Sequence, residues 1–309
     1  MTTARLMLLD TAAMYFRAFH GVPDTVRSPR GEPVNAVRGL LDMIARLVGE
    51  FGPADVVACW DDDWRPAWRV ALIPSYKAHR VERLVADGPD VETVPPELTA
   101  QVPVIRAVLT ALGIPIVGAA GYEADDVIGT IAATASDGVA GPRVDVVTGD
   151  RDLFQVVDDA RGVRVIYTGR GMSRLEVLTD AALAAKYGVS PAQYPDFATL
   201  RGDASDGLPG VAGIGEKTAA ALLAQHGSLA GVLAAADAGT LAATVTARLR
   251  AASGYLAVAP RVVAVARDVP LAPGALDPRP IDGAALAELD ARWGLGASLS
   301  RVRASLAPA

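Results

Sequence analysis

The stretch Val-Asp-Val-Val-Thr-Gly-Asp-Arg-Asp at residues 144–152 decides the fold of this chain. Its first four residues predict a buried strand, and two carboxylates, Asp150 and Asp152, follow just beyond the end of that strand. A turn with a helix N-cap would explain either acid alone, but it explains the pair less well. Two acids so close together at a strand end favour a cation site.

Two earlier stretches repeat this pattern of a short apolar run that ends in acid. Residues 6–9 lead into Asp10, and residues 56–60 lead into the run Asp61, Asp62 and Asp63. Asp10 by itself is also explained as the N-cap of a following helix, and the acidic run is also explained as a solvated loop. The sequence does not decide which member of the run points inward.

Helical periodicity lies between the predicted strands. It covers residues 34–48, 96–112 and 123–135, with a further strand at 114–117. Strands that alternate with helices imply an α/β fold with a mostly parallel, twisted sheet flanked by helices, whose functional groups lie at the carboxyl ends of the strands. Helices dominate from residue 179 onward, so we divide the chain into a core at 1–178 and a helical part at 179–309.

The length of 309 residues suits one α/β catalytic domain with a smaller appendage. The single cysteine, Cys59, rules out a disulfide framework, and its apolar neighbours predict a buried side chain. No segment approaches the ~20 apolar residues of a membrane span. The apolar start is too short for a signal peptide, so we expect a cytoplasmic protein.

The net charge of −6 taken alone argues against a polyanionic partner. Divalent ions on the clustered acids would leave the remaining surface net positive. Basic residues are dense in one segment, where only Glu82 opposes Arg65, Arg69, Lys77, Arg80 and Arg83. A nucleic acid would meet that local positive field.

The densest acidic cluster is Glu123, Asp125 and Asp126, at the start of a predicted helix. Acids there benefit from the helix dipole, which is the simplest alternative account. Glu123 and Asp126 nevertheless share one helical face with Asp125 beside them, and capping does not require that concentration. We therefore predict that this cluster binds metal.

A last pair of acids, Asp203 and Asp206, lies three residues apart, without the spacing or terminal glutamate of an EF-hand loop. Acids gathered from all these segments would repel one another unless cations sat among them, which indicates a polynuclear metal site. The predicted ligands are Asp10, Asp61, Glu123, Asp125, Asp126, Asp150, Asp152, Asp203 and Asp206.

A glycine-rich hairpin follows directly. Gly213 and Gly215 flank Ile214, so the backbone can approach another molecule closely, and a helix begins at Glu216 with its free N–H groups facing the hairpin. Such a turn suits a nucleic-acid phosphate held without base reading. A tight helix–helix connection is the alternative.

These pieces together resemble the 5′-nuclease, or flap endonuclease, family, which includes the N-terminal 5′→3′ exonuclease domain of bacterial DNA polymerase I. Several multi-residue motifs in the right order make the resemblance specific. The chain also resembles the stand-alone actinobacterial form, and we expect a free-standing nuclease. The matching segments are residues 9–10, 15–20, 76–80, 121–126, 148–153 and 202–219, with a weaker match at 267–271.

The resemblance implies a PIN-like 5′-nuclease core, a helical arch at about residues 64–95, and a helix–three-turn–helix DNA-binding subdomain within 179–309 whose last helices pack on the core. It implies a monomeric phosphodiesterase that uses two or more Mg²⁺ or Mn²⁺ ions. Its substrates would be branched, nicked or flapped DNA, RNA primers on DNA included, cut by exonuclease and flap endonuclease action in replication and repair. Two ions roughly 4 Å apart would activate water and stabilise the attacking and leaving oxygens.

The resemblance also assigns roles to individual acids. Asp125 and Asp150 would be catalytic. Asp61 is the open assignment, because counting back without gaps from residues 68–69 places the family's ligand at Asp62. The set that would surround the inner ion is Asp10, Asp61, Glu123, Asp125 and Asp126. The set that would serve the outer ion is Asp150, Asp152, Asp203 and Asp206.

The basic residues of the arch would act on the DNA. Lys77 and Arg80 would hold the scissile phosphate and stabilise developing charge, and Tyr76 would stack on an unpaired base. Arg17 would meet a phosphate, with a structural ion pair as the alternative. An ordinary charged surface helix is the alternative for the whole arch segment.

The hairpin would bind duplex DNA through Gly213, Gly215 and Lys217, while backbone carbonyls of Val211 and Ile214 would hold potassium. Gly207 departs from the asparagine common in the family, which bears on fine positioning. Two other functions were weighed. A PIN-type ribonuclease would need neither arch nor hairpin, and a non-catalytic DNA-binding protein would lack carboxylates.

Overall fold

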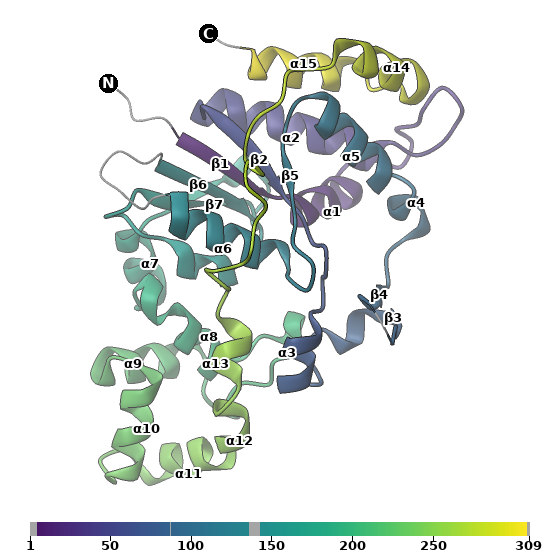
Figure 1. Cartoon of the computed structure of the whole chain (residues 1–309). Coiled ribbons are helices and arrows are strands. Elements are labelled where there is room, and N and C mark those ends of the chain that lie inside the picture. The colour runs from purple at the N-terminus through teal and green to yellow at the C-terminus, as the bar shows by residue number, and fades with distance from the viewer. Residues whose placement is uncertain (1–4, 87, 136–142, 308–309) are drawn as a thin grey trace.

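The computed structural model describes residues 5–86, 88–135 and 143–307. A six-stranded sheet in the order β5-β2-β1-β6-β7-β8 forms its centre (Figure 1). All neighbouring strands are parallel except β8, which is antiparallel to β7 at one edge. The predicted mostly parallel sheet is therefore confirmed. The strands are β1 (Arg5–Asp10), β2 (Asp55–Cys59), β5 (Ile116–Val117), β6 (Arg143–Thr148), β7 (Val163–Tyr167) and β8 (Glu176–Leu178).

The register of the central strands brings their carboxyl ends to one edge. Asp10 pairs with Cys59 across β1 and β2, and Leu9 pairs with Val147 across β1 and β6. The acids that follow these strands therefore start from neighbouring positions along the same edge.

Helices cover both faces of the sheet. Leu6 and Leu8 pack in a buried cluster with α6 (Ala124–Ala135), whereas Met7 and Leu9 pack in another cluster with α1 (Thr11–Gly21) and α2 (Asn35–Phe51). Because successive side chains of a strand point to opposite faces, burial of both faces requires a continuous apolar run. That requirement explains why the strands have no alternating polar pattern.

The helical part leaves the core after β8 and then returns to it. In Figure 1, α9 to α12 stand at the bottom, away from the sheet, and α14 and α15 lie at the top. There α15 packs on α2, and α14 packs on α5 (Val102–Ala111). The helices of this part are α7 (Asp180–Tyr187), α8 (Tyr194–Arg201), α9 (Glu216–His226), α10 (Leu229–Asp237), α11 (Ala243–Ala251), α12 (Ser253–Leu256), α13 (Ala259–Val263), α14 (Gly283–Trp293) and α15 (Gly296–Leu306).

The single helix predicted over residues 96–112 is two helices, α4 (Pro96–Thr99) and α5. Pro103 lies in the first turn of α5. Proline has no N–H with which to continue the hydrogen bonds of a preceding helix, but it fits at the start of a new one. The apolar periodicity runs through this break, so the pattern alone missed it.

The expected helical arch also needs correction. Among its described residues, only α3 (Ala67–Leu72) and the 3-10 turn η1 (Ala78–Arg80) are helical, while β3 (Val81–Arg83) and β4 (Val91–Glu92) form an antiparallel pair. The extended Ile73 that ends α3 precedes Pro74, and a residue before proline disfavours helical geometry. This segment is therefore a short helix followed by a small hairpin.

No single helix in the described part of the chain is long and apolar enough to cross a membrane, although α9 and α10 together would pass on length and composition as a pair bent by 81°.

Candidate active site

A cavity of about 420 Å³ opens at the carboxyl edge of the sheet. Its acidic side chains come from the ends of β1 and β2, from β4, from the start of α6 and from the loop after β6. The acids in its wall are Asp10, Asp61, Glu92, Glu123, Asp125 and Asp150, and Arg17, Lys77 and Arg80 line it as well. The structure thus brings five of the nine predicted ligands to one cavity.

Asp10 both caps a helix and belongs to the cavity. Its Oδ1 accepts a hydrogen bond from the Ala13 N–H at 3.2 Å, and its Oδ2 accepts one from Thr148 Oγ1 at 2.7 Å. Burial raises the pKa of Asp10 to about 7 despite these hydrogen bonds, and Asp61 and Asp150 add to the rise. A capping role for Asp10 therefore does not exclude a role in the cavity.

Of the run from Asp61 to Asp63, only Asp61 lines the cavity. Its Oδ1 accepts a hydrogen bond from the Ala124 N–H at 2.8 Å, and burial raises its pKa to about 6. Asp62 is exposed, and the buried Asp63 turns back to accept from the Arg65 N–H at 3.1 Å. The structure thus favours Asp61, the member of the run named in the predicted ligand set, over Asp62, to which the ungapped count led.

The two acids at the start of α6 differ in their surroundings. Burial raises the pKa of Asp125 well above its ordinary value, and the charges of Asp150 and Asp10 raise it further. Glu123 instead has partners: it accepts from Tyr76 Oη at 2.6 Å and pairs with Lys77 Nζ.

A second group of acids adjoins the cavity. Burial raises the pKa of Asp152 well above its ordinary value, and Asp150, Asp206 and Asp203 raise it further. Burial also raises the pKa of Asp206 to about 6. The Oδ1 atom of Asp152 is buried without a hydrogen-bond partner, while Asp203 accepts from Arg201 Nη2 at 3.2 Å.

This chemistry fits hard cations. Buried carboxylates with raised pKa values lack compensating positive charge, and a buried oxygen without a partner lacks a donor or an ion. Oxygen ligands alone suit Mg²⁺ or Mn²⁺. In the described residues, however, no three acidic, histidine or cysteine side chains already surround one point closely enough to hold an ion. Ion binding therefore requires side-chain rotation, because several of these oxygens now accept hydrogen bonds.

Asp126 has a different environment from the other predicted ligands. It is fully buried and forms a bidentate ion pair with Arg69, with both N–O distances at 2.7 Å. Its oxygens also accept the N–H groups of Glu123 at 3.2 Å and Ala266 at 2.8 Å. These four bonds satisfy the carboxylate, so we leave Asp126 out of the ligand set proposed below.

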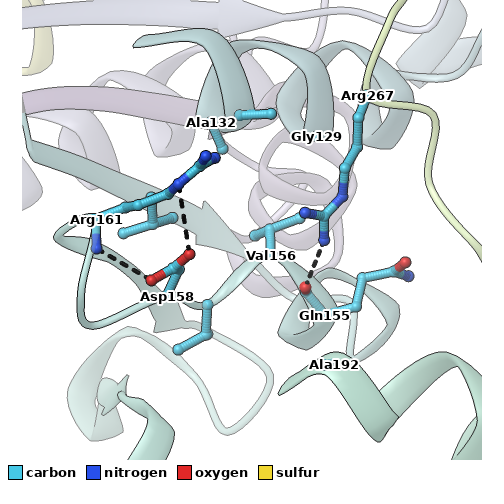
Figure 2. Close-up of a pocket in the computed structure, with 11 residues that line it drawn as sticks. Gly129, Ala132, Gln155, Val156, Asp158, Arg161, Ala192 and Arg267 are labelled. Atoms are coloured by element: carbon cyan, nitrogen blue, oxygen red, sulfur yellow. Dashed lines mark hydrogen bonds and ion pairs between the residues drawn. The ribbon is translucent and has the colours of Figure 1, made fainter. Parts of the chain in front are cut away.

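The segment after α13 is tied down beside this ion pair. Gln155 Oε1 accepts from the Val265 N–H at 3.0 Å, and Arg267 Nη2 donates to the Gln155 carbonyl at 3.0 Å. Figure 2 shows Arg267 reaching across a small cavity of about 120 Å³ toward Gln155, with Arg161 paired to Asp158 on the other side. No cluster of acids lines this cavity, so we assign it a structural role.

The residues of the arch segment that were predicted to act on DNA lie in different environments. Lys77 and Arg80 line the acidic cavity, where Lys77 pairs with Glu123 and Arg80 pairs with Glu92. Tyr76 is only 4% exposed. Its stacking on a base therefore needs correction, because its ring is packed in the core and its hydroxyl is bound to Glu123.

Arg17 lies in the wall of the cavity. Its Nε is buried without a hydrogen-bond partner, and no ion pair of Arg17 is found among the described residues. The alternative of a structural ion pair is therefore not supported within those residues. The free guanidinium remains available to an anion in the cavity.

The glycine hairpin connects α8 to α9, with a 3-10 turn at Ala204–Asp206 before it. Gly213 has a φ of +76°, and Gly213, Gly215 and Lys217 are exposed, as docking against another molecule requires. Val211 and Ile214 are buried and anchor the turn. The Val211 carbonyl accepts from the Ile214 N–H at 2.9 Å.

Sequence reasoning missed three partners of the predicted site. Arg69 was counted only as part of a basic surface, although it neutralises Asp126. Thr148, the last residue of β6, holds Asp10, and Arg248 Nη1 donates to the Gly213 carbonyl at 3.0 Å. Arg248 is far from the hairpin in sequence, so no local signal points to it.

Two family models match the chain in sequence order. The model of the 5′-3′ exonuclease N-terminal resolvase-like domain matches residues 5–188, and the model of the 5′-3′ exonuclease C-terminal SAM fold matches residues 189–283. The chain belongs to the 5′-3′ exonuclease family. The resemblance indicated by the sequence motifs is therefore confirmed.

Curated relatives of this 5′-3′ exonuclease family member agree. The 5′-3′ exonuclease of Streptomyces coelicolor is 62% identical over 304 residues, which cover 97% of this chain and 99% of that protein. The 5′-3′ exonuclease of Mycobacterium tuberculosis is 49% identical, with 97% of each chain covered. DNA polymerase I of Mycobacterium bovis is 40% identical over 268 residues, which are 86% of this chain but 28% of the polymerase.

Solved structures share the fold. The T5 D15 protein co-crystallised with metal ions has a TM-score of 0.63 and 17% identity, with 98% of each chain covered. The catalytic core of Rad2 in complex with a DNA substrate has a TM-score of 0.55 and 15% identity, covering 93% of this chain and 86% of that one. At these identities the likeness shows the fold alone, and it supports the predicted α/β core with a helical part.

Proposed function

We propose that this exonuclease-family chain is a structure-specific 5′-nuclease that hydrolyses DNA phosphodiester bonds near single-strand/duplex junctions. One observation carries the proposal: a cavity lined by six carboxylates also contains Lys77 and Arg80, and an exposed glycine hairpin follows the loop of Asp203 and Asp206. A DNA strand whose duplex part rests on the hairpin would present its phosphodiester bond to the acidic and the basic side chains of the cavity together.

The proposed ligands divide into two sets. Asp10, Asp61, Glu123 and Asp125 would hold the inner ion, and Asp150, Asp152, Asp203 and Asp206 would hold the outer one. Bound Mg²⁺ or Mn²⁺ would supply an activated water and would stabilise both the attacking and the leaving oxygen. Asp125 adjoins the outer set, because the charge of Asp150 raises the pKa of Asp125.

Lys77 and Arg80 supply positive charge for the phosphodiester. Burial lowers the pKa of Lys77, but Glu123, Tyr76 and Asp206 together outweigh burial and hold that pKa well above its ordinary value. The amine therefore stays protonated at neutral pH. When Glu123 turns to a cation, Lys77 is released to a non-bridging phosphate oxygen, where its charge stabilises the transition state.

The hairpin and Arg17 would hold the DNA backbone. The backbone of the exposed Gly213 and Gly215 and the amine of Lys217 suit duplex phosphates that are held without base reading. Carbonyls of Val211 and Ile214 would accept a potassium ion that bridges the protein to a phosphate. Arg17 has an unpartnered Nε beside the acids and would contact the phosphate next to the cut.

The proposed partners are branched, nicked or flapped DNA and RNA primers on DNA, bound by a monomer during replication and repair. Support comes from structural neighbours whose complexes contain DNA, among them human GEN1 with Holliday junction DNA. Because intracellular DNA is the proposed substrate, we place this action in the cytoplasm.

The test is cleavage of a 5′-labelled flap with magnesium, with manganese and with EDTA, beside blunt and nicked duplexes and an RNA flap. We expect metal-dependent products that end near the junction, and product length separates endonuclease from exonuclease action. Equal rates on all duplexes would refute structure specificity, and preference for RNA would favour a PIN-type ribonuclease.

The matched variants are Asp125→Asn and Asp62→Asn. Asp125→Asn should abolish cleavage and leave the Kd for the junction within a few-fold, whereas Asp62→Asn, at an exposed neighbour of Asp61, should cut at the wild-type rate. Undiminished cleavage by Asp125→Asn would refute the metal assignment. Junction binding by a wild type that never cuts would indicate a non-catalytic DNA-binding protein.

A further inference from the structure

The loop at residues 202–210 is closed on itself as one rigid unit. Asp203 and Leu208 exchange two backbone hydrogen bonds, at 2.9 and 2.8 Å. Gly202 and Gly210 both have positive φ, and a Cβ on Gly202 would lie 2.6 Å from the Gly210 nitrogen. Only glycine fits such a close backbone contact. The loop continues directly into the hairpin at Gly213, so the two are expected to move together.

The tip of this loop presses against the segment that carries Lys77. The Lys77 N–H donates to the Asp206 carbonyl at 2.9 Å, and Ser75 Oγ donates to the Gly207 carbonyl at 2.9 Å. Gly207 has a φ of +70°, and a Cβ there would lie only 2.2 Å from the Ser75 carbonyl oxygen. The contact therefore leaves no room for a side chain at Gly207.

Lys77 itself has an unusual backbone. Its φ of +47° makes it the only non-glycine residue with positive φ in the described part of the chain. A bulky residue in this region costs free energy and persists only where its surroundings hold it. The hydrogen bond to Asp206 holds the backbone, and the ion pair with Glu123 holds the side chain. Lys77 thus spans the distance between the rigid loop and the acidic cavity.

We propose that this contact, formed by Ser75 and Lys77 on one side and Asp206 and Gly207 on the other, is a latch through which the duplex-binding loop positions Lys77 for cleavage. Gly207 and Ser75 are then positioning residues of the reaction. The inference rests on the proposed function, in which Lys77 contacts the scissile phosphate.

The latch explains how duplex binding and cutting are coupled. A duplex backbone that docks on the hairpin restrains the rigid loop, and the two hydrogen bonds of the loop restrain the backbone of Lys77. The amine then points into the cavity with little remaining freedom, which lowers the entropic part of the barrier. A strand without a duplex beside it leaves the loop, and hence Lys77, less restrained.

The first arm of the test removes one hydrogen bond. Ser75→Ala should slow single-turnover cleavage of a 5′-labelled flap about fivefold, the value of one ordinary hydrogen bond. Its Kd for the same flap should stay within twofold. Ser75→Thr keeps the hydroxyl and should restore the wild-type rate. Wild-type rates for Ser75→Ala, or failure of Ser75→Thr to rescue, would overturn the latch.

The second arm uses a glycine with a matched control. Gly207→Ala places its Cβ against the Ser75 carbonyl and should slow cleavage by about 10²-fold. Gly239→Ala has the same φ of +70° but meets nothing within 4 Å, so it carries the backbone cost without the clash. It should cut at the wild-type rate.

The third arm asks whether the latch acts through Lys77. Lys77→Ala should slow cleavage about 10²-fold, and adding Ser75→Ala or Gly207→Ala to it should change the rate less than twofold, because both act on the same group. Full additivity would refute the coupling. If Gly207→Ala does not fold by circular dichroism, the Ser75 variants in both backgrounds decide the question. A wild type that never cuts the flap would refute the proposed function instead, which separates the two failures.

Discussion

At the scale of single residues, two adjacent aspartates have opposite roles. Asp125 has a pKa raised by burial and by like charges, so its ionised form is disfavoured in the folded protein. Asp126 instead has Arg69 and two backbone N–H groups as hydrogen-bond donors, and its carboxylate is satisfied inside the protein. Position in α6 separates them, because consecutive residues of a helix point about 100° apart.

This difference predicts opposite effects on stability without metal. Asp126→Asn leaves Arg69 with a weakened partner in the core and should lower the free energy of unfolding by about 3 kcal/mol. Asp125→Asn removes a repelled charge and should leave stability unchanged or raise it. Urea denaturation in EDTA measures both. Equal destabilisation by the two variants would contradict the assignment of Asp126 to a structural ion pair.

The raised pKa values also predict how metal binding depends on pH. Asp10 has a pKa of about 7, and Asp61 and Asp206 have pKa values of about 6, all above the ordinary 3.8. Without metal, these carboxyl groups lose their protons at a lower pH in the unfolded chain than in the folded protein. The free energy of unfolding therefore falls as pH rises from about 4 to 7, and it stays constant above that range. Divalent ions bound to these carboxylates would replace the protons and remove this loss of stability.

The Mg²⁺-induced rise in Tm should therefore grow from pH 5.5 to pH 7.5 and level off above that. Thermal melts with magnesium and with EDTA at each pH measure it. Asp62→Asn is the control and should follow the wild-type curve. A shift that is constant over this range, or largest at pH 5.5, would contradict the cation site.

At the scale of elements, proline and long-range contacts end helices at positions that the apolar periodicity did not predict. Pro103 divides the predicted helix at residues 96–112, and Pro74 stops α3. Apolar spacing records which side chains are buried, but it does not record where a backbone N–H is missing. Strand ends were predicted better, because an acid that follows an apolar run marks both the end of the strand and the edge of the sheet.

The C-terminal helix α15 shows how an element far along the chain supports the core. Leu299 is buried in the cluster that α15 shares with α2. Leu299→Ala should lower the free energy of unfolding by about 2–5 kcal/mol through lost burial and a cavity. Arg303→Ala, on the exposed side of the same helix, should change it by less than about 0.5 kcal/mol. Chemical denaturation measures the free energy of unfolding of both variants. Equal effects would show that α15 does not pack on the core.

At the scale of the whole molecule, the cavity and the hairpin perform separable tasks. Residues of the cavity would act on the bond that breaks, while the hairpin would hold duplex on the other side of the rigid loop. Binding energy from the hairpin is electrostatic and should weaken with salt, because the protein displaces counterions from DNA. The chemical step at saturating DNA should depend on salt far less.

Lys217→Ala should therefore raise the Kd for a flap and reduce the slope of log Kd against log salt by about one. The single-turnover rate at saturating DNA should stay at the wild-type value. Lys186→Ala is the control, because Lys186 lies in α7 and pairs with Glu176. A loss in cleavage rate without a change in the salt slope would place Lys217 in the cavity rather than at the duplex.

By itself, the sequence determined the mostly parallel sheet, the acids at its carboxyl edge and the glycine hairpin, because each rests on local patterns of strand, acid and turn. Tertiary structure alone decided that Asp61 faces the cavity rather than Asp62, that Asp126 pairs with Arg69, and that Tyr76 is buried. It also decided that Gly207 meets Ser75. The reason is physical: these outcomes depend on contacts between segments tens to more than a hundred residues apart, and such contacts have no signature in local spacing.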